Sequence, residues 1–167
     1  MSAVTRFKGF SLVETMVAAT LILTVFTSVY AMINYTLVNI NYIQNGLTAL
    51  FLAQEGIELT IAKRDANWLN NQPFDNGLGD GVYTADYTGV FSLVGSPQDN
   101  PPLRFSEAVG YQYVQGELSG FYRTLTVRKL RDEELMVTAE VSWTVRGRTF
   151  TTNTESHLFD WFNVPQI

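Results

Sequence analysis

The sequence contains no cysteine. Disulfide bonds, thiolate catalysis and cysteine-based zinc or iron–sulfur sites are therefore excluded. It has a single histidine, His157, which rules out two-histidine metal motifs and leaves one candidate base for a nucleophilic enzyme. No G-x-S-x-G or similar nucleophile arrangement accompanies it, so we expect His157 to be a polar surface residue. The sequence predicts no enzyme and no cofactor.

Positive charge is also scarce, with 11 Lys+Arg against 16 Asp+Glu and a formal net charge of -5. Nucleic acid is not expected as a partner, because phosphate binding favours a basic surface. The basic residues of one predicted strand and its turn do cluster: Arg123, Arg128, Lys129 and Arg131. Three acidic residues follow directly at 132–134, so the cluster predicts a solvated turn of ion pairs.

Charge is almost absent from residues 10–33, a run of 24 residues in which Glu14 is the only charged side chain. As a helix the run would span about 36 Å, enough to cross a bilayer. It is longer than the apolar core of a secretory signal, and no A-x-A cleavage site follows. Arg6 and Lys8 precede it, which places residues 1–9 in the cytoplasm. The simplest interpretation is a single-pass signal anchor.

Glu14 does not fit that simple interpretation. A carboxylate inside a spanning helix costs about 3 kcal/mol on insertion scales, and such residues usually have a partner. No lysine or arginine occurs between Glu14 and Lys63. This helix therefore cannot supply the partner.

The stretch from Lys8 to Glu14, KGFSLVE, resembles the processing site of type IV pilins and type II secretion pseudopilins. The resemblance implies cleavage between Gly9 and Phe10 by a prepilin peptidase, N-methylation of Phe10, and a role for Glu14 as the family's signature acid. Cleavage would create an ammonium at Phe10, which Glu14 of a neighbouring subunit could approach during filament assembly.

The resemblance also implies partners and a location. The partners are the prepilin peptidase/methyltransferase, other pilin subunits in a helical filament and an inner-membrane assembly platform. The protein would lie in the bacterial inner membrane as a single-pass protein with a cytoplasmic leader. It would then move into an extracellular pilus or a periplasmic pseudopilus.

Residues 34–64 predict an amphipathic continuation of the same helix, since no proline occurs between Phe10 and Pro73. Gly46 and Gly56 weaken it by about 1 kcal/mol each relative to alanine. We expect the hydroxyls of the membrane half to bond carbonyls of the preceding turn, namely those of Thr15, Thr20, Thr24, Thr27 and Ser28. The apolar stripe of the second half is Leu37, Ile40, Ile43, Leu47, Leu50, Ala53, Ile57 and Ile61.

Residues 65–167 predict a globular β-sheet domain that begins with a polar loop at 65–81. Strand patterns follow at 82–94, as one or two strands, and at 110–115. The strongest are 121–130, 135–146 and 149–159, which short turns join into an antiparallel meander. If the helical stripe covers the sheet, the fold class is α+β, helix on sheet. This agrees with the pilin fold that the resemblance implies.

Two smaller features of this domain lead to expectations. Asp75, Asn76 and Asp80 are weak calcium candidates, but their spacing does not match an EF-hand and a glycine turn with polar caps is expected. Trp68 could attach the loop after the helix to the sheet. Without a disulfide, hydrophobic packing must hold residues 158–167, through Leu158, Phe159, Trp161 and Phe162.

The sequence therefore predicts a structural subunit, a minor pilin, of a type IV pilus-like filament. A minor pseudopilin of a type II secretion system remains the alternative within the family. A membrane-anchored binding domain that never polymerises is the alternative outside it.

Overall fold

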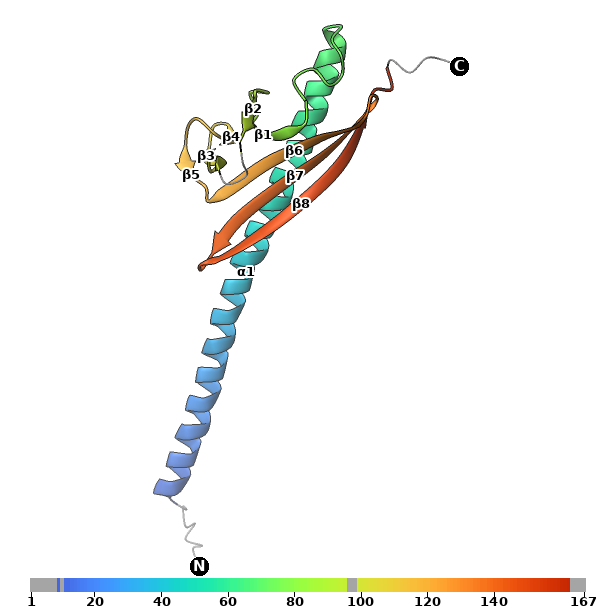
Figure 1. Ribbon diagram of the computed structural model, residues 1–167. Coiled ribbons are helices and arrows are strands. Elements are labelled where there is room, and N and C mark those ends of the chain that lie inside the picture. The colour runs from blue at the N-terminus through green and yellow to red at the C-terminus, as the bar shows by residue number, and fades with distance from the viewer. Residues whose placement is uncertain (1–8, 10, 96–98, 163–167) are drawn as a thin grey trace, which may run out of the picture. The chain divides into compact units, whose positions relative to one another are not determined.

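The computed structural model describes residues 9, 11–95 and 99–162. They belong to two compact units, Met1–Ile43 and Gln44–Ile167. One helix, α1 (Leu12–Leu69), runs from the first unit into the second (Figure 1). The helix continues past the expected boundary at residue 64, because residues 65–69 contain neither proline nor glycine. The expected loop at 65–81 therefore starts only after Leu69.

The end of α1 is fixed by a Schellman motif. Asn71 has a positive φ of 55°, the left-handed conformation that closes many helices. The Gln72 N–H donates to the Asn67 carbonyl and the Asn71 N–H to the Trp68 carbonyl. The last carbonyls of the helix are thus satisfied by the chain that leaves it.

The main sheet of the second unit has five antiparallel strands in the order β2-β1-β6-β7-β8. The expected meander is confirmed as β6 (Phe121–Arg131), β7 (Glu134–Val145) and β8 (Arg148–Phe159). The pattern at 82–94 forms two strands, β1 (Gly81–Ala85) and β2 (Phe91–Val94). The second unit is therefore α+β, with the end of a helix on an antiparallel sheet (Figure 1).

A second, three-stranded sheet has the order β4-β3-β5. Only β4 (Gly110–Gln112) coincides with an expected strand, that at 110–115. β3 (Arg104–Ser106) and β5 (Glu117–Leu118) were not predicted. Strands of two or three residues are too short to show an alternating pattern.

The core lies between the sheet and residues 49–60 of α1. In β7 the expected alternation is confirmed, since Leu135, Val137, Ala139, Val141 and Trp143 are all buried. They meet Leu125 and Val127 of β6 and Leu158 of β8 in one apolar cluster. β7 thus supplies the central row of the core.

The helical stripe that covers this core differs from the predicted one. Of the predicted residues only Ala53 and Ile57 are buried, whereas Leu47 and Leu50 are 51% and 45% exposed. The buried residues of the helix are mostly small: Ala49, Leu52, Ala53, Gly56, Ile57, Thr60 and Asn67. At Gly56 an added Cβ would lie 2.6 Å from Leu125 Cδ2. The sheet approaches most closely at Gly56, while the large side chains of Leu52 and Ile57 are buried on either side of it along the helix.

The turn between β7 and β8 consists of Arg146 and Gly147, with φ values of 50° and 77°. Positive φ at both positions is typical of a two-residue type I′ hairpin turn. The turn was expected at Gly147 and Arg148, but Arg148 is already the first residue of β8. The result is a narrow projection with an arginine on each side of its glycine.

Candidate functional site

The segment predicted for processing lies directly before α1. Gly9 is exposed and outside the helix, and no atom lies within 4 Å of the position a Cβ would take. Phe10, the expected site of cleavage and N-methylation, lies outside the described residues, as do Arg6 and Lys8. Gly9 is therefore accessible to a second protein, as far as the described residues show.

Glu14 lies in the first turn of α1, exposed, and forms no ion pair within the described ranges. A carboxylate in this turn is stabilised by the partial positive charge of the helix N-terminus. Ser11 directly precedes the helix and Glu14 follows three residues later, the S-x-x-E spacing of a capping box. Neither side chain forms a capping hydrogen bond among the described residues, so the helix dipole is the local source of stabilisation for the Glu14 carboxylate.

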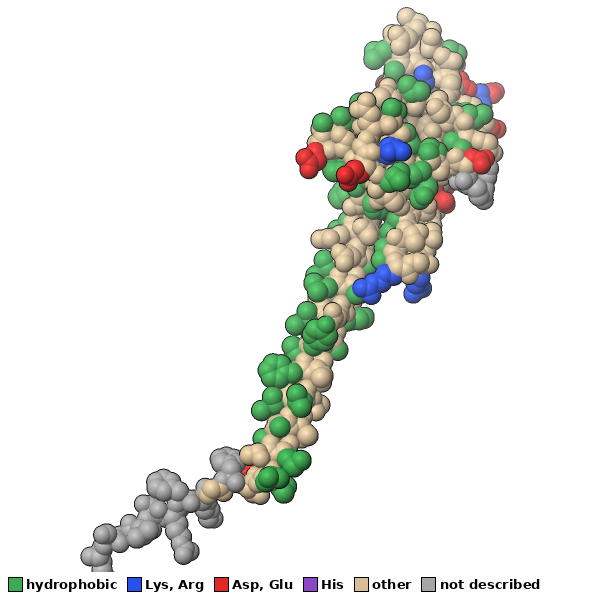
Figure 2. Space-filling model, turned by 90° about the vertical axis from the view of Figure 1, so that its left-hand side faces the viewer, with side chains coloured by type: hydrophobic (Ala, Val, Ile, Leu, Met, Phe, Trp, Pro, Cys, Tyr) green, Lys and Arg blue, Asp and Glu red, His purple; other side chains and the backbone are tan. Residues whose placement is uncertain are grey.

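The first unit presents an apolar surface. Its helix carries exposed large hydrophobic side chains along its length, among them Leu12, Met16, Leu21, Phe26 and Ile33 (Figure 2). The predicted hydroxyl bonds are confirmed, for example from Thr24 to the Thr20 carbonyl at 2.8 Å and from Ser28 to the Thr24 carbonyl at 2.8 Å. α1 is long and apolar enough to cross a membrane, and the threonine and serine hydroxyls of this stretch bond to carbonyls of the same helix.

Arg123 is not part of a solvated basic cluster, as the sequence suggested. Its side chain is 0% exposed and bridges three elements of the second unit. Nη1 donates to the Leu52 carbonyl of α1 at 3.0 Å and pairs with Glu55 Oε2 at 3.1 Å, while Nη2 donates to the Ala85 carbonyl of β1 at 2.6 Å. Arg123 shares the inward-facing alternation of Phe121, Leu125 and Val127, a signal that could have shown its burial.

A second group of polar residues lies next to Arg123. The Tyr113 hydroxyl donates to the Arg123 carbonyl at 3.0 Å, and burial raises the pKa of Tyr113 to about 12. Burial also raises the pKa of Asp86. Hydrogen bonds from the Thr88 hydroxyl and from the N–H groups of Thr88 and Tyr113, with the charge of Arg123, outweigh it and leave that pKa below its ordinary value. This network connects Tyr113, which follows β4 of the small sheet, to β6, the strand whose Arg123 bonds to α1.

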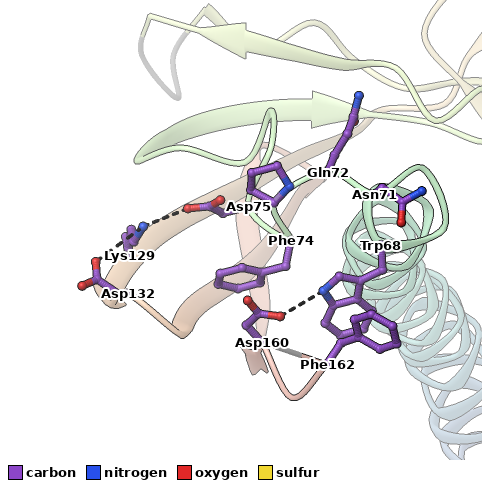
Figure 3. A pocket seen from close by; sticks show the side chains of 10 residues that line it. Trp68, Asn71, Gln72, Phe74, Asp75, Lys129, Asp132, Asp160 and Phe162 are labelled. Atoms are coloured by element: carbon purple, nitrogen blue, oxygen red, sulfur yellow. Dashed lines mark hydrogen bonds and ion pairs between the residues drawn. The ribbon is translucent and has the colours of Figure 1, made fainter. Parts of the chain in front are cut away.

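A groove of about 450 Å³ lies where α1 ends and the C-terminal segment leaves β8 (Figure 3). Trp68, Phe74 and Phe162 provide aromatic walls. The Trp68 indole N–H donates to Asp160 Oδ1 at 3.0 Å, and its ring meets Trp161 edge-on at 4.9 Å. Trp68 was expected to attach the loop after the helix to the sheet. It lies instead within α1 and contacts the segment that follows β8.

Of the four residues expected to hold residues 158–167 by packing, only Leu158 is buried, whereas Phe159, Trp161 and Phe162 are 50%, 63% and 65% exposed. The Trp161 and Phe162 rings contact the Trp68 ring at the surface, because this segment has left the sheet. Residues 163–167 lie outside the described part.

The weak calcium candidates do not converge on one point. Asp75 Oδ2 pairs with the Lys129 ammonium at 2.9 Å, and this hydrogen bond and charge raise the pKa of Lys129. Asp80 accepts from the Lys129 backbone N–H, and the Asn76 side chain donates to Gln72. Within the described residues no group of three or more histidine or acidic side chains could hold a metal ion.

His157 is exposed on the opposite face of β8 from buried Leu158, as expected. Its Nδ1 lies 2.8 Å from Glu134 Oε1 and its Nε2 3.7 Å from Glu155 Oε1. The described surroundings place no serine or threonine nucleophile in hydrogen-bond contact with the ring. His157 thus belongs to a surface row of polar side chains.

No protein-family model matches this sequence, and neither a curated protein nor a solved structure is significantly similar to it.

Proposed function

We propose that this chain is a structural subunit, of the minor kind, of a type IV pilus-like filament, with the pilin fold. The observation that carries the proposal is the arrangement at the start of α1. An accessible Gly9 lies outside the helix, and Glu14 follows in the first helical turn. An apolar helical surface then continues beyond it.

In this proposal a prepilin peptidase cuts between Gly9 and Phe10 and a methyltransferase modifies the new amine. The methylated amine keeps its positive charge. In the apolar surroundings of a helical bundle, an acid without a partner is penalised and a pair is held strongly. Glu14 of one subunit then selects the axial position in which it meets Phe10 of another.

The exposed apolar side chains of the first unit suit two successive environments. They face lipid while the subunit waits in the inner membrane, and they face other helices once the assembly platform has moved the subunit into the filament. Because the hydroxyls of this stretch bond their own helix, the transfer breaks no side-chain hydrogen bond that the structure describes.

The second unit contributes a scaffold and carries no catalytic role in the proposal. Arg123 of β6 bonds to α1 at Leu52 and Glu55, so force applied along the helix is transmitted to β6 through charged hydrogen bonds. A minor pseudopilin of a type II secretion system would use the same parts. Recovery of the chain in sheared surface fibres would distinguish a pilus from a short periplasmic filament.

Two substitutions at one position test the proposal. Gln suits the third position of a capping box as Glu does, whereas Ala does not. If Glu14 pairs with the Phe10 amine, Glu14→Gln and Glu14→Ala both reduce incorporation into sheared filaments, while leader cleavage persists. If Glu14 only caps the helix, Glu14→Gln behaves like the wild type, which would contradict the pairing. Unchanged function in both variants would favour a membrane-anchored domain that does not polymerise.

A further inference from the structure

The two ends of the main sheet differ in charge. At one end the β7–β8 turn exposes Arg146 and Arg148, and neither forms an ion pair within the described part of the chain. Figure 2 shows basic side chains at the lower edge of the globular unit, the edge at which this turn lies in Figure 1. The type I′ geometry makes the turn narrow, so the two exposed arginines lie close together on a small tip. The Arg148 guanidinium lies over the Phe150 ring of β8 at 5.8 Å.

The groove beside Trp68 lies at the other end, where β6 turns into β7 and β8 leaves the sheet. Its walls carry the carboxylates of Asp75, Asp132 and Asp160 and the single ammonium of Lys129, a formal charge of -2 from three acids and one base. Asp132 is fully exposed, and its only described contact is Lys129 at 3.8 Å. The groove therefore has negative charge available to a cationic partner.

The groove is also lined by aromatic rings, with Trp68, Phe74 and Phe162 among its walls. Arginine suits such surroundings better than lysine, because the planar guanidinium stacks on rings and forms paired bonds with carboxylates. The described part of the chain shows this chemistry twice, since Arg64 lies over the Trp68 ring at 4.6 Å and Arg148 over the Phe150 ring at 5.8 Å. A volume of about 450 Å³ falls within the range of sites that admit a ligand group.

We propose that the Arg146–Arg148 turn of one copy docks into the groove of a second copy of this chain. The two surfaces are complementary, because the narrow tip carries two arginines that form no ion pair with any described residue and the groove at the far end of the same sheet is negative and partly aromatic. A turn and a groove at opposite ends of one sheet can pair reciprocally, as a two-fold dimer, or in one orientation, as an open series. The parallel subunits of the proposed filament select the second, head-to-tail arrangement. Repetition of such a contact produces an open series of copies in one orientation.

This proposal rests on the proposed filament and deepens it by naming a contact between subunits. It adds a contact in the globular units to the one between Glu14 and Phe10. It also means that copies of this chain follow one another in the filament, in short runs if the chain is a minor subunit.

The absence of cysteine gives a clean background for a crosslinking test. The full chain carrying both Asp132→Cys and Arg148→Cys is assembled into filaments and oxidised. β7 separates the two positions by 12 residues, about 40 Å at about 3.3 Å per residue, so no disulfide can form within one chain. The contact predicts a ladder of crosslinked multimers. Each single-cysteine variant serves as control and should stay monomeric.

Charge reversal provides an independent readout in the same filaments. Arg146→Glu with Arg148→Glu should lower filament incorporation at least about tenfold, because acidic tips then face an acidic groove. Adding Asp132→Arg to that chain should restore part of the incorporation, because Asp132 is fully exposed and its charge can be reversed without breaking a buried contact. Arg128→Glu, on the exposed face of β6, is the matched control and should assemble normally.

The possible failures are distinguishable. If the double-cysteine chain enters filaments at the wild-type level and stays monomeric on oxidation, the head-to-tail contact is wrong and the filament proposal stands. If a single-cysteine variant gives crosslinked dimers, a two-fold contact replaces it. If the wild-type chain itself is absent from filaments, both proposals fail.

Discussion

The two stretches of α1 use apolar residues in opposite ways. From Leu12 to Ile43 the large hydrophobic side chains are exposed, and the helix bonds its own hydroxyls. From Gln44 to Leu69 the buried positions are mostly small, and Leu47, Leu50 and Phe51 stay on the outside. The face that meets the sheet therefore combines two large apolar residues, Leu52 and Ile57, with small residues at the points of closest approach. The first stretch suits an apolar surrounding, and the second suits a close protein neighbour.

The largest expected effect comes from breaking the link between the second stretch and the sheet. Arg123→Met removes the charged donors to the Leu52 and Ala85 carbonyls and leaves Glu55 without its partner. We expect the free energy of unfolding to fall by about 3 kcal/mol. Urea unfolding of the full chain in detergent, followed by tryptophan fluorescence, measures it. The exposed Arg128→Met should change it by less than about 0.5 kcal/mol, and equal losses would contradict the buried role of Arg123.

A titration tests the polar network behind that link. Tyr113 has a pKa raised to about 12 in the folded state, against about 10 when unfolded. The folded protein therefore holds this proton more tightly, and its stabilising contribution is lost as the pH rises from about 10 to about 12. The loss should reach about 2 kcal/mol. Tyr113→Phe, measured over the same pH range, should lack this part of the decline; identical pH profiles would show that Tyr113 is not the titrating group.

The two glycines within the second stretch sharpen the size argument. At Gly56 a Cβ would lie 2.6 Å from Leu125 Cδ2, whereas at Gly46 the nearest atom is 3.9 Å away. Gly56→Ala should destabilise the protein by about 1–2 kcal/mol through overpacking, despite the better helix propensity of alanine. Gly46→Ala should stabilise it by up to about 1 kcal/mol. Thermal unfolding of both variants under the same conditions measures the effect, and the unfolding temperature should fall for Gly56→Ala and rise for Gly46→Ala.

The smallest effect is expected in the first stretch. Phe26 is 69% exposed, so Phe26→Ala should change the unfolding free energy of the globular unit by less than about 0.5 kcal/mol. Leu125→Ala, at a fully buried position of β6, should cost about 2–5 kcal/mol in the same assay. A comparable loss for Phe26→Ala would mean that the first stretch contributes to the folding of the sheet.

The sequence predicted the continuous helix, the three long strands and the bonded hydroxyls because each has a long periodic or local pattern. It placed the buried stripe of α1 correctly at Ala53, Ile57 and the partly buried Ile61. It was wrong at Leu47 and Leu50, since a hydrophobicity pattern ranks Leu50 above Gly56 and does not show how closely the sheet approaches. Arg123 was predicted to be solvated because of its charge, although its position two residues before Leu125 places it on the buried face of β6. The groove could not be predicted, because residues distant in sequence, such as Trp68 and Asp160, meet only in the fold.

The most direct test of the proposed function is the mass of the N-terminal peptide from protein recovered in sheared filaments. The proposal predicts a chain that begins at Phe10 with a methylated α-amine, its leader removed after Gly9. An intact Met1, or a cut at any other position, would contradict it.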